Sequence, residues 1–158
     1  MYIYSPTIEL EQPFKTLYKP LYRYGMKLSR DKELVQECIR CIYADLLSGS
    51  ISEGKNSVKV YTFFALRQGL IENSAVKSQL PEMEFELDEF KNSEIQTKLL
   101  DVANNLTSQQ REVVYLKYMA ALSYQEIAHI MEIPGTEVKQ CFAVSMQAIR
   151  RELNARIN

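Results

Sequence analysis

The fold of this chain is decided by residues 106–133, which read LTSQQREVVYLKYMAALSYQEIAHIMEI. Two capping boxes punctuate this stretch, one at Thr107–Gln110 and one at Ser123–Glu126. In a capping box, the first hydroxyl and the side chain three residues later each accept a hydrogen bond from a backbone N–H that the helix leaves without a partner. The two boxes therefore predict two helices, one beginning at Ser108 and the other at Tyr124.

A longer helix is expected after the second box. Pro134–Gly135 ends the preceding helix, because proline cannot continue a helix and glycine favours its end, and Thr136–Leu153 then forms a last helix. Helix, short turn, helix, turn and longer helix is the layout of a helix-turn-helix unit, whose recognition helix enters the major groove of DNA. The stretch therefore predicts an all-helical C-terminal domain, residues 95–158.

The last helix divides into two faces at about 100° per residue. The face that must pack in the core holds Val138, Phe142, Ser145, Ile149 and Leu153. The candidate DNA contacts lie outside that face and are Lys139, Gln140, Ala143, Val144, Gln147, Arg150 and Arg151. Gln140 suits a bidentate contact to an adenine edge, Ala143 or Val144 suits a thymine methyl, and the cations suit phosphates. The alternative is a helix face that is only solvated.

The first 78 residues have apolar residues at helical spacing in three or four segments. A first helix opens at Pro13, Pro20 either kinks it or restarts it one turn later, and Ser29–Asp31 breaks it. The apolar face of a second helix holds Leu34, Val35, Cys38, Ile39, Ile42 and Leu46. Leu47–Ser57, with two glycines and four serines, has the composition of a loop. The apolar side of a third helix holds Val60, Tyr61, Phe64, Ile71 and neighbouring residues.

Acidic residues concentrate between these two blocks. Residues 1–79 carry 11 Lys and Arg against 8 Asp and Glu, residues 80–97 carry one against six, and residues 98–158 carry seven against six. The balances of +3, −5 and +1 sum to the net charge of −1. We expect residues 79–94 to be an extended acidic linker, with a strand at Met83–Leu87 as the alternative. A chain this weakly basic needs a partner to supply part of the electrostatics if it binds duplex DNA.

Other classes of function lack the residues they need. No nucleophile–base pair, glycine-rich phosphate loop or carboxylate pair supports catalysis, so neither enzyme activity nor a cofactor is expected. Zinc at Cys38–Cys41 would need four ligands, and only Cys141 and His129 remain, so a buried structural thiol is the favoured interpretation. Three cysteines, no signal pattern and no apolar run near ~20 residues predict a cytoplasmic protein without membrane insertion.

Both blocks resemble the extracytoplasmic-function sigma factors of bacterial RNA polymerase. The C-terminal block is similar to the promoter −35-binding domain of that family at Arg111–Val113, Leu122–Ala128 and Val138–Lys139. Response-regulator output domains share part of this pattern. The first block is similar to the polymerase-binding and −10-melting domain at Leu17–Gly25, Asp31–Val35 and Lys59–Glu72. The two domains, in this order, cover about nine-tenths of the chain.

The resemblance implies an all-α protein of two small domains, residues 1–78 and 95–158, that binds core RNA polymerase, promoter DNA and an anti-sigma factor. It implies −10 contacts at Lys55, Asn56, Lys59, Tyr61 and Arg67. Leu47–Ser57 corresponds to the loop that receives a flipped base, and Phe63 and Phe64 are further candidates for stacking. The resemblance implies polymerase contacts at Glu33, Gln36, Glu37, Arg40 and Tyr43. The acidic linker is expected in the positively lined channels of polymerase, or as a solvated tether.

Several residues depart from the family pattern. Arg40 and Cys41 replace the usual Gln-Glu, residues 73–79 lack the usual basic run, and Cys141 and Val144 stand where arginine or another polar residue is common. The leading hypothesis is a sigma factor that binds core RNA polymerase and directs promoter recognition and transcription initiation. The departures keep a second hypothesis open, a sigma-like interaction protein that binds polymerase or an anti-sigma factor without specific promoter binding.

Overall fold

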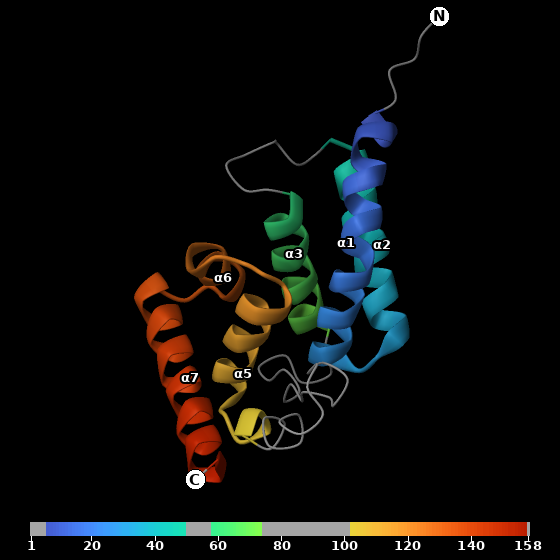
Figure 1. Ribbon diagram of the computed structural model, residues 1–158. Helices are drawn as coiled ribbons and strands as arrows, with labels where there is room; N and C mark the ends of the chain where they lie inside the picture. The colour runs from blue at the N-terminus through green and yellow to red at the C-terminus, as the bar shows by residue number, and fades with distance from the viewer. Residues whose placement is uncertain (1–5, 50–57, 74–101, 158) are drawn as a thin grey trace, which may run out of the picture. The chain divides into compact units, whose positions relative to one another are not determined.

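Helices make up all the regular secondary structure described (Figure 1). The computed structural model describes residues 6–49, 58–73 and 102–157. Within these ranges there is no strand, which confirms the predicted all-helical fold. No helix among them is both long enough and apolar enough to cross a lipid bilayer.

The chain divides into two compact units, Met1–Pro81 and Glu82–Asn158. The point of division falls inside the acidic segment, residues 79–94, that we expected to be a linker. That segment, and the strand considered at Met83–Leu87, lie outside the described residues. Each unit is held together by contacts among its own helices, so each is described by itself.

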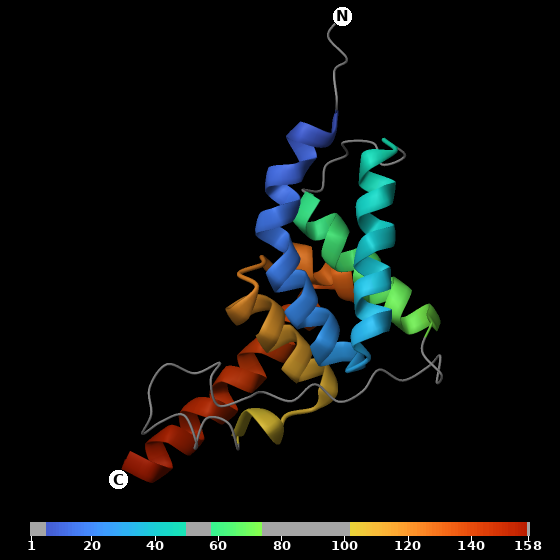
Figure 2. The same ribbon diagram turned by 90° about the vertical axis from the view of Figure 1, so that its right-hand side faces the viewer.

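The first unit is a bundle of three helices, α1 (Pro6–Ser29), α2 (Lys32–Leu47) and α3 (Val58–Asn73), each of which packs against the other two (Figure 2). At its centre the rings of Tyr24 and Phe63 lie 5.2 Å apart between centroids, tilted by 32°. Burial of large apolar side chains such as these is the main term that stabilises the bundle. The other core residues are Leu21, Leu28, Val35, Ile39, Ile42, Leu46, Val60, Leu66 and Leu70.

Two glycines allow the helices of this bundle to approach closely. A Cβ atom at Gly25 of α1 would lie 2.6 Å from Cγ1 of Val35 on α2, which is shorter than any contact in a close-packed core. A Cβ atom at Gly69 of α3 would lie 3.3 Å from Sγ of Cys38 on α2. Both glycines therefore serve as contact points between helices and not as turn residues.

The break between α1 and α2 lies where the sequence predicts it. α1 ends at Ser29, and Arg30 has a φ of 61°, in the left-handed region that takes the chain out of a helix. The carboxylate of Asp31 then accepts a hydrogen bond from the backbone N–H of Leu34 over 3.2 Å and caps the start of α2. These local interactions confirm the predicted break.

The predicted start of the first helix at Pro13 is wrong. α1 begins at Pro6 and continues through both Pro13 and Pro20. A proline at the start of a helix costs little, because its missing N–H has no intrahelical partner there. An interior proline removes one backbone hydrogen bond, and the packing of α1 on α2 and α3 offsets that loss.

The buried face of α3 also differs from the predicted one. Val60 is buried as expected, but the other predicted core residues are only half-buried: Tyr61, Phe64 and Ile71. The side chains that fill the core instead are Thr62, Phe63, Leu66 and Leu70. Apolar residues surround α3, so their spacing does not define a single apolar face. Packing against α1 and α2 selects the buried side.

The second unit contains α5 (Ser108–Val114), the π-helical turn η2 (Tyr115–Met119), α6 (Tyr124–Met131) and α7 (Gly135–Ile157). α5 and α6 each pack against α7. Both capping boxes are formed. The hydroxyls of Thr107 and Ser123 accept backbone N–H bonds of 3.2 and 3.1 Å, and the side chains three residues later accept return bonds of 3.0 and 2.8 Å. The predicted helix starts are confirmed.

α5 passes directly into η2. The N–H of Ala120 donates to the carbonyl of Tyr115 over 3.2 Å, five residues back, which is the π-helical pattern. The N–H of Leu122 donates to the carbonyl of Leu116 over 3.1 Å, and Ala121, with a φ of 56°, ends the segment. Around this junction Arg111–Leu116 are all buried, so α5 is the central helix of the second unit.

The turn between α6 and α7 begins earlier than predicted. α6 ends at Met131, because Glu132 adopts a left-handed backbone with a φ of 57°. The predicted end at Pro134–Gly135 is therefore late. α7 spans Gly135–Ile157 and extends beyond the predicted range of Thr136–Leu153 at both ends. The helix-turn-helix order itself is as predicted.

Candidate nucleic-acid interface

α7 is anchored to the second unit by a small set of buried residues. Val138 and Ser145 are fully buried, and the hydroxyl of Ser145 donates to the carbonyl of Cys141 over 2.6 Å. Phe142 is half-buried, and its ring lies 5.8 Å from that of Tyr124 on α6. Of the remaining residues predicted for this face, Ile149 is half-buried, and the side chain of Leu153 lies outside the described part of the chain. The predicted core face of α7 is thus buried most deeply in its first half.

All seven candidate −35 contacts on α7 are exposed. They are Lys139, Gln140, Ala143, Val144, Gln147, Arg150 and Arg151. At 100° per residue they occupy a sector of about 140° around the helix, and no acidic residue of α7 falls inside it. Val144 is 45% exposed. The sector therefore combines cations for phosphates, amides for base edges and an apolar surface for a thymine methyl.

One edge of α7 contacts α5 through two hydrogen bonds of the Gln109 side chain. Nε2 of Gln109 donates to Oε1 of Glu137 over 3.2 Å, and the thiol of Cys141 donates to Oε1 of Gln109 over 3.7 Å. Burial raises the pKa of the Cys141 thiol, with a further contribution from the Glu137 carboxylate. Cys141, one of the departures from the family pattern, therefore faces α5 and lies outside the exposed sector.

The residues that lead into the recognition helix have structural contacts of their own. Nε of Arg111 donates to the carbonyl of Leu106 over 2.9 Å, in a buried position. Nζ of Lys117 lies 4.5 Å above the ring of Tyr124, a cation–π contact between η2 and α6. His129 on α6 is exposed. No local sequence pattern predicts the contact of Lys117 with Tyr124, because the two residues lie on different helices, η2 and α6.

The candidate −10 residues are only partly described. Lys55 and Asn56, like the rest of the proposed base-receiving loop beyond Gly49, lie outside the described residues. Lys59, Tyr61 and Arg67 are half-buried on α3. Burial raises the pKa of the Tyr61 phenol, and the Asp45 carboxylate raises it further.

The structure does not bring these α3 residues to one face. Tyr61 and Arg67 are six residues apart and so point about 120° away from each other. Phe63 is fully buried in the core, so its ring is not exposed for base stacking. Phe64 is half-buried and is the remaining candidate of the two.

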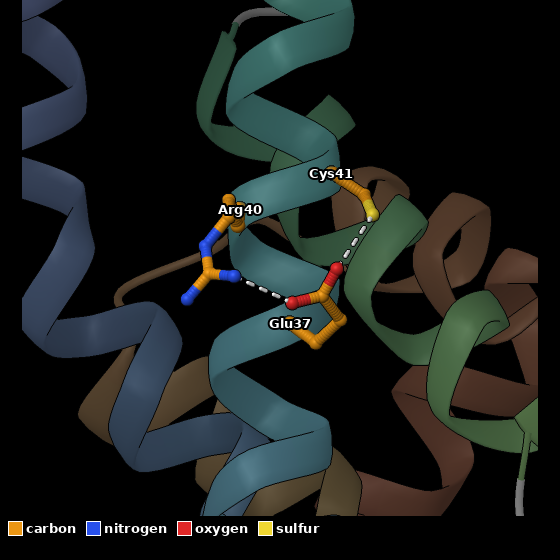
Figure 3. A network of polar contacts seen from close by, with 3 residues as sticks. All are labelled: Glu37, Arg40 and Cys41. Carbon is orange, nitrogen blue, oxygen red and sulfur yellow. Dashed lines mark hydrogen bonds and ion pairs between the residues drawn. The ribbon is translucent and has the colours of Figure 1, made fainter.

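The candidate polymerase contacts lie on α2. Glu33, Glu37 and Arg40 are exposed, and Gln36 and Tyr43 are half-buried. Nη1 of Arg40 lies 2.8 Å from Oε2 of Glu37, and the thiol of Cys41 donates to Oε1 of Glu37 over 3.8 Å (Figure 3). Two of the positions that depart from the family pattern are thus joined through a single carboxylate. Because the pair is exposed, it stabilises the folded chain by about 1 kcal/mol at most and is available to rearrange against a partner.

The two cysteines of α2 differ in their surroundings. Cys38 is half-buried against Gly69, and burial raises the pKa of its thiol, with smaller contributions from Cys41 and Glu37. Cys41, by contrast, is exposed. In the described part of the chain, no three His, Cys, Asp or Glu side chains are grouped as metal ligands would be.

Comparison with known proteins agrees with this arrangement. Residues 96–140 match the family model described as sigma-70, region 4, which covers α5, α6 and the start of α7. No curated protein matches the chain. Among solved structures, the chain is similar to the sigma factor RpoE of Bartonella quintana, crystallised in complex with the anti-sigma factor NepR. The identity is 16%, the TM-score is 0.62, and the match covers 92% of this chain and 97% of that one.

These comparisons confirm the resemblance to sigma factors in two respects. The family model identifies a sigma-70 region 4 in the second unit. The structural match extends over nearly the whole of both chains and shows that the chain has the same fold as the sigma factor RpoE.

Proposed function

We propose that this chain is a sigma factor that binds core RNA polymerase and directs promoter recognition and transcription initiation. One observation carries the proposal. The exposed sector of α7, free of acidic residues of that helix, belongs to a helix-turn-helix whose residues 96–140, up to the start of α7, match sigma-70 region 4. A recognition helix of this kind reads base edges in the major groove. The weak overall charge of −1 is consistent with a subunit that binds DNA together with polymerase and not alone.

On this proposal, α7 contacts the −35 element. Gln140, near the start of the helix, makes the base contact, since a glutamine amide can bond an adenine edge bidentately. Lys139, Arg150 and Arg151 contact phosphates. Ala143, Val144 and Gln147 complete the surface in the groove. The helix-turn-helix domain comprises residues 95–158.

The first domain, residues 1–78, supplies the remaining contacts. The exposed side of α2, with Glu33, Gln36, Glu37, Arg40 and Tyr43, binds core polymerase. Lys55, Asn56, Lys59, Tyr61 and Arg67 contact the opened −10 element. Residues 79–94 join the two domains and carry the acidic charge that suits a positively lined channel. We infer that the chain acts in the cytoplasm, without catalytic activity of its own.

An anti-sigma factor is a further proposed partner. The structural neighbour was crystallised with the anti-sigma factor NepR, and a chain with the same fold can present comparable surfaces to such a protein. Val144 is an apolar residue that is 45% exposed, and a protein partner would cover it.

A second candidate function is supported by the same departures from the family pattern. Val144 is apolar at a position where a polar residue is common. On α2, Glu37 and Arg40 form an ion pair with each other. A sigma-like protein that binds polymerase or an anti-sigma factor without specific promoter binding would tolerate both features.

Transcription with purified components separates the two functions. Core RNA polymerase is combined with this chain and a library of promoter fragments, and the starts of the transcripts are sequenced. The proposed function requires transcripts from defined sequences that disappear without the chain. Binding to core polymerase without sequence-specific transcripts would favour the interaction protein, and absence of polymerase binding would contradict both.

A further inference from the structure

Two of the three cysteines lie one turn apart on α2. Cys38 and Cys41 occupy positions i and i+3 of the helix, and side chains at this spacing are neighbours on a helix surface. The thiol of Cys41 donates to Oε1 of Glu37 over 3.8 Å (Figure 3). The sulfur of Cys41 therefore lies over the preceding turn, which carries Glu37 and Cys38, because a helical side chain leans toward the N-terminus of its helix.

Neither of these cysteines is fully buried. Cys41 is exposed and Cys38 is half-buried. Cys38 faces α3 at Gly69, where an added Cβ atom would lie 3.3 Å from its Sγ. Because glycine has no side chain, the residue of α3 beside this sulfur places no side chain against it. The two thiols are therefore adjacent on a part of α2 that a small ligand can reach.

The surroundings of Cys38 disfavour a second negative charge. Burial raises the pKa of the Cys38 thiol, and the negative charges of Cys41 and Glu37 raise it further. Thiolates at these two positions would repel each other, and a cation bound between them would replace that repulsion by attraction. Cys38 therefore keeps its proton at neutral pH unless a cation with a high affinity for sulfur displaces it.

The geometry of the helix favours a bridging ion over a disulfide. Side chains three residues apart on a helix have Cβ atoms about 5–6 Å apart, whereas a disulfide needs Cβ atoms about 3.8 Å apart. Two metal–sulfur bonds of about 2.3 Å, the length found with zinc, span sulfurs that are up to ~4.6 Å apart. α2 can therefore hold a shared ion without the distortion that a disulfide would impose on it.

The number of ligands selects the ion. A structural zinc takes four ligands, and in the described part of the chain no three His, Cys, Asp or Glu side chains are grouped as metal ligands. Cu(I) is a soft ion that thiolates select, and as a filled-shell ion of single charge it is satisfied by two of them. We propose that Cys38 and Cys41 form a two-coordinate Cu(I) site on α2.

The proposed site is balanced in charge and in hydrogen bonds. Binding displaces both thiol protons to solvent, so two thiolates and one Cu(I) form a complex with a charge of −1. When the Cys41 thiol leaves Glu37, that carboxylate keeps its ion pair with Arg40, at 2.8 Å. The inference goes beyond the proposed function and does not depend on it, since the site needs neither polymerase nor DNA.

Competition for Cu(I) tests the proposal on the full chain. The reduced protein, freed of reductant under argon, is titrated into the coloured complex of Cu(I) with bicinchoninate, and the loss of colour measures the Cu(I) transferred. The wild type takes up one equivalent. Cys38→Ala and Cys41→Ala each lower the affinity more than about tenfold, because removal of even an outer partner of a metal ligand typically costs about 10–100-fold. Cys141→Ala, which removes the other half-buried thiol, is the matched control and binds Cu(I) as the wild type does.

Labelling of the wild-type chain gives a second measurement that needs no variant. One equivalent of Cu(I) slows the reaction of Cys38 and Cys41 with iodoacetamide and leaves the rate at Cys141 unchanged, as measured by peptide mapping. Circular dichroism of each variant in the competition experiment confirms that the helices are intact.

Three outcomes would overturn the proposal. Unchanged Cu(I) affinity in either Cys38→Ala or Cys41→Ala would mean that the two thiols do not share an ion. Protection of Cys141 in place of Cys38 would move the site to the second unit. Saturation at half an equivalent, with a dimer in size-exclusion chromatography, would assign the ion to Cys41 of two chains. Transcription by the wild-type chain is measured separately, so a failed Cu(I) titration rejects only this inference and leaves the proposed function standing.

Discussion

Gln109 of α5 donates a hydrogen bond from Nε2 to Oε1 of Glu137 on α7, over 3.2 Å. Its Oε1 accepts the thiol hydrogen of Cys141, one turn further along α7, over 3.7 Å. One amide thus orients two turns of the recognition helix. Because Cys141 faces α5, its departure from the family pattern leaves the exposed sector of Lys139 and Gln140 intact.

Gln109→Ala should destabilise the second unit. The variant removes both hydrogen bonds and leaves Glu137 and Cys141 without this partner, at an expected loss of about 0.5–1.5 kcal/mol in the free energy of unfolding. Urea unfolding followed by circular dichroism measures the change. Gln125→Ala, at an exposed position of α6, is the matched control. A loss no larger than that of Gln125→Ala would mean that the contact does not hold α7.

Gly25→Ala should destabilise the first unit although alanine favours helices. The new Cβ would lie 2.6 Å from Cγ1 of Val35, and overpacking of this kind typically costs about 1–3 kcal/mol. Val35→Ala removes the clashing methyl groups, so the double variant should lose less stability than the sum of the two single variants. Additive losses in a thermal unfolding cycle would contradict the close approach of α1 and α2.

Substitutions on α7 should separate specificity from affinity. Gln140→Ala removes the proposed base contact and should reduce discrimination at one −35 base pair by about 1–3 kcal/mol. Lys139→Ala should weaken binding to all sequences equally and reduce the salt dependence, by about 0.9 in slope on duplex DNA. Transcription from a randomised −35 library, with polymerase present, measures both effects. Unchanged sequence preference in Gln140→Ala would favour the interaction-protein hypothesis.

The three thiols should react in a defined order. Cys41 is exposed and should be modified first by a thiol reagent at pH 8. Cys38 and Cys141 are half-buried, and burial raises the pKa of both, which lowers the fraction of reactive thiolate. Peptide mapping after timed labelling gives the order. Faster modification of Cys38 than of Cys41 would contradict the packing of Cys38 against Gly69.

The same raised pKa values predict a loss of stability at alkaline pH. Below the ordinary thiol pKa of 9.0, the protonated thiols are present in both states and their stabilising effect is complete. As the pH rises from there through the raised folded pKa, the unfolded chain loses these protons first, and the free energy of unfolding decreases. The decrease between pH 8 and pH 10 should be smaller in Cys38→Ala/Cys141→Ala than in the wild type.

The sequence by itself determined the features that depend on neighbouring residues. The starts of α5 and α6 follow from Thr107 and Ser123, because each capping box satisfies backbone N–H groups within four residues. The break at Ser29–Asp31 is equally local. The exposed residues of α7 follow from the spacing of its core positions. The match to sigma-70 region 4 rests on residues 96–140, which contain both capping boxes. Local hydrogen bonds and helical periodicity are sufficient for these features.

Tertiary structure decided the rest. Apolar residues surround α3, so only packing against α1 and α2 could bury Phe63 and leave Phe64 at the edge of the core. Contacts of α1 with the bundle carry it through Pro20, where sequence rules allow a break. The hydrogen-bond partner of Cys141 is Gln109, a residue 32 positions away. Such features arise from contacts between helices, and no local pattern in the chain records which side of a helix another helix will cover.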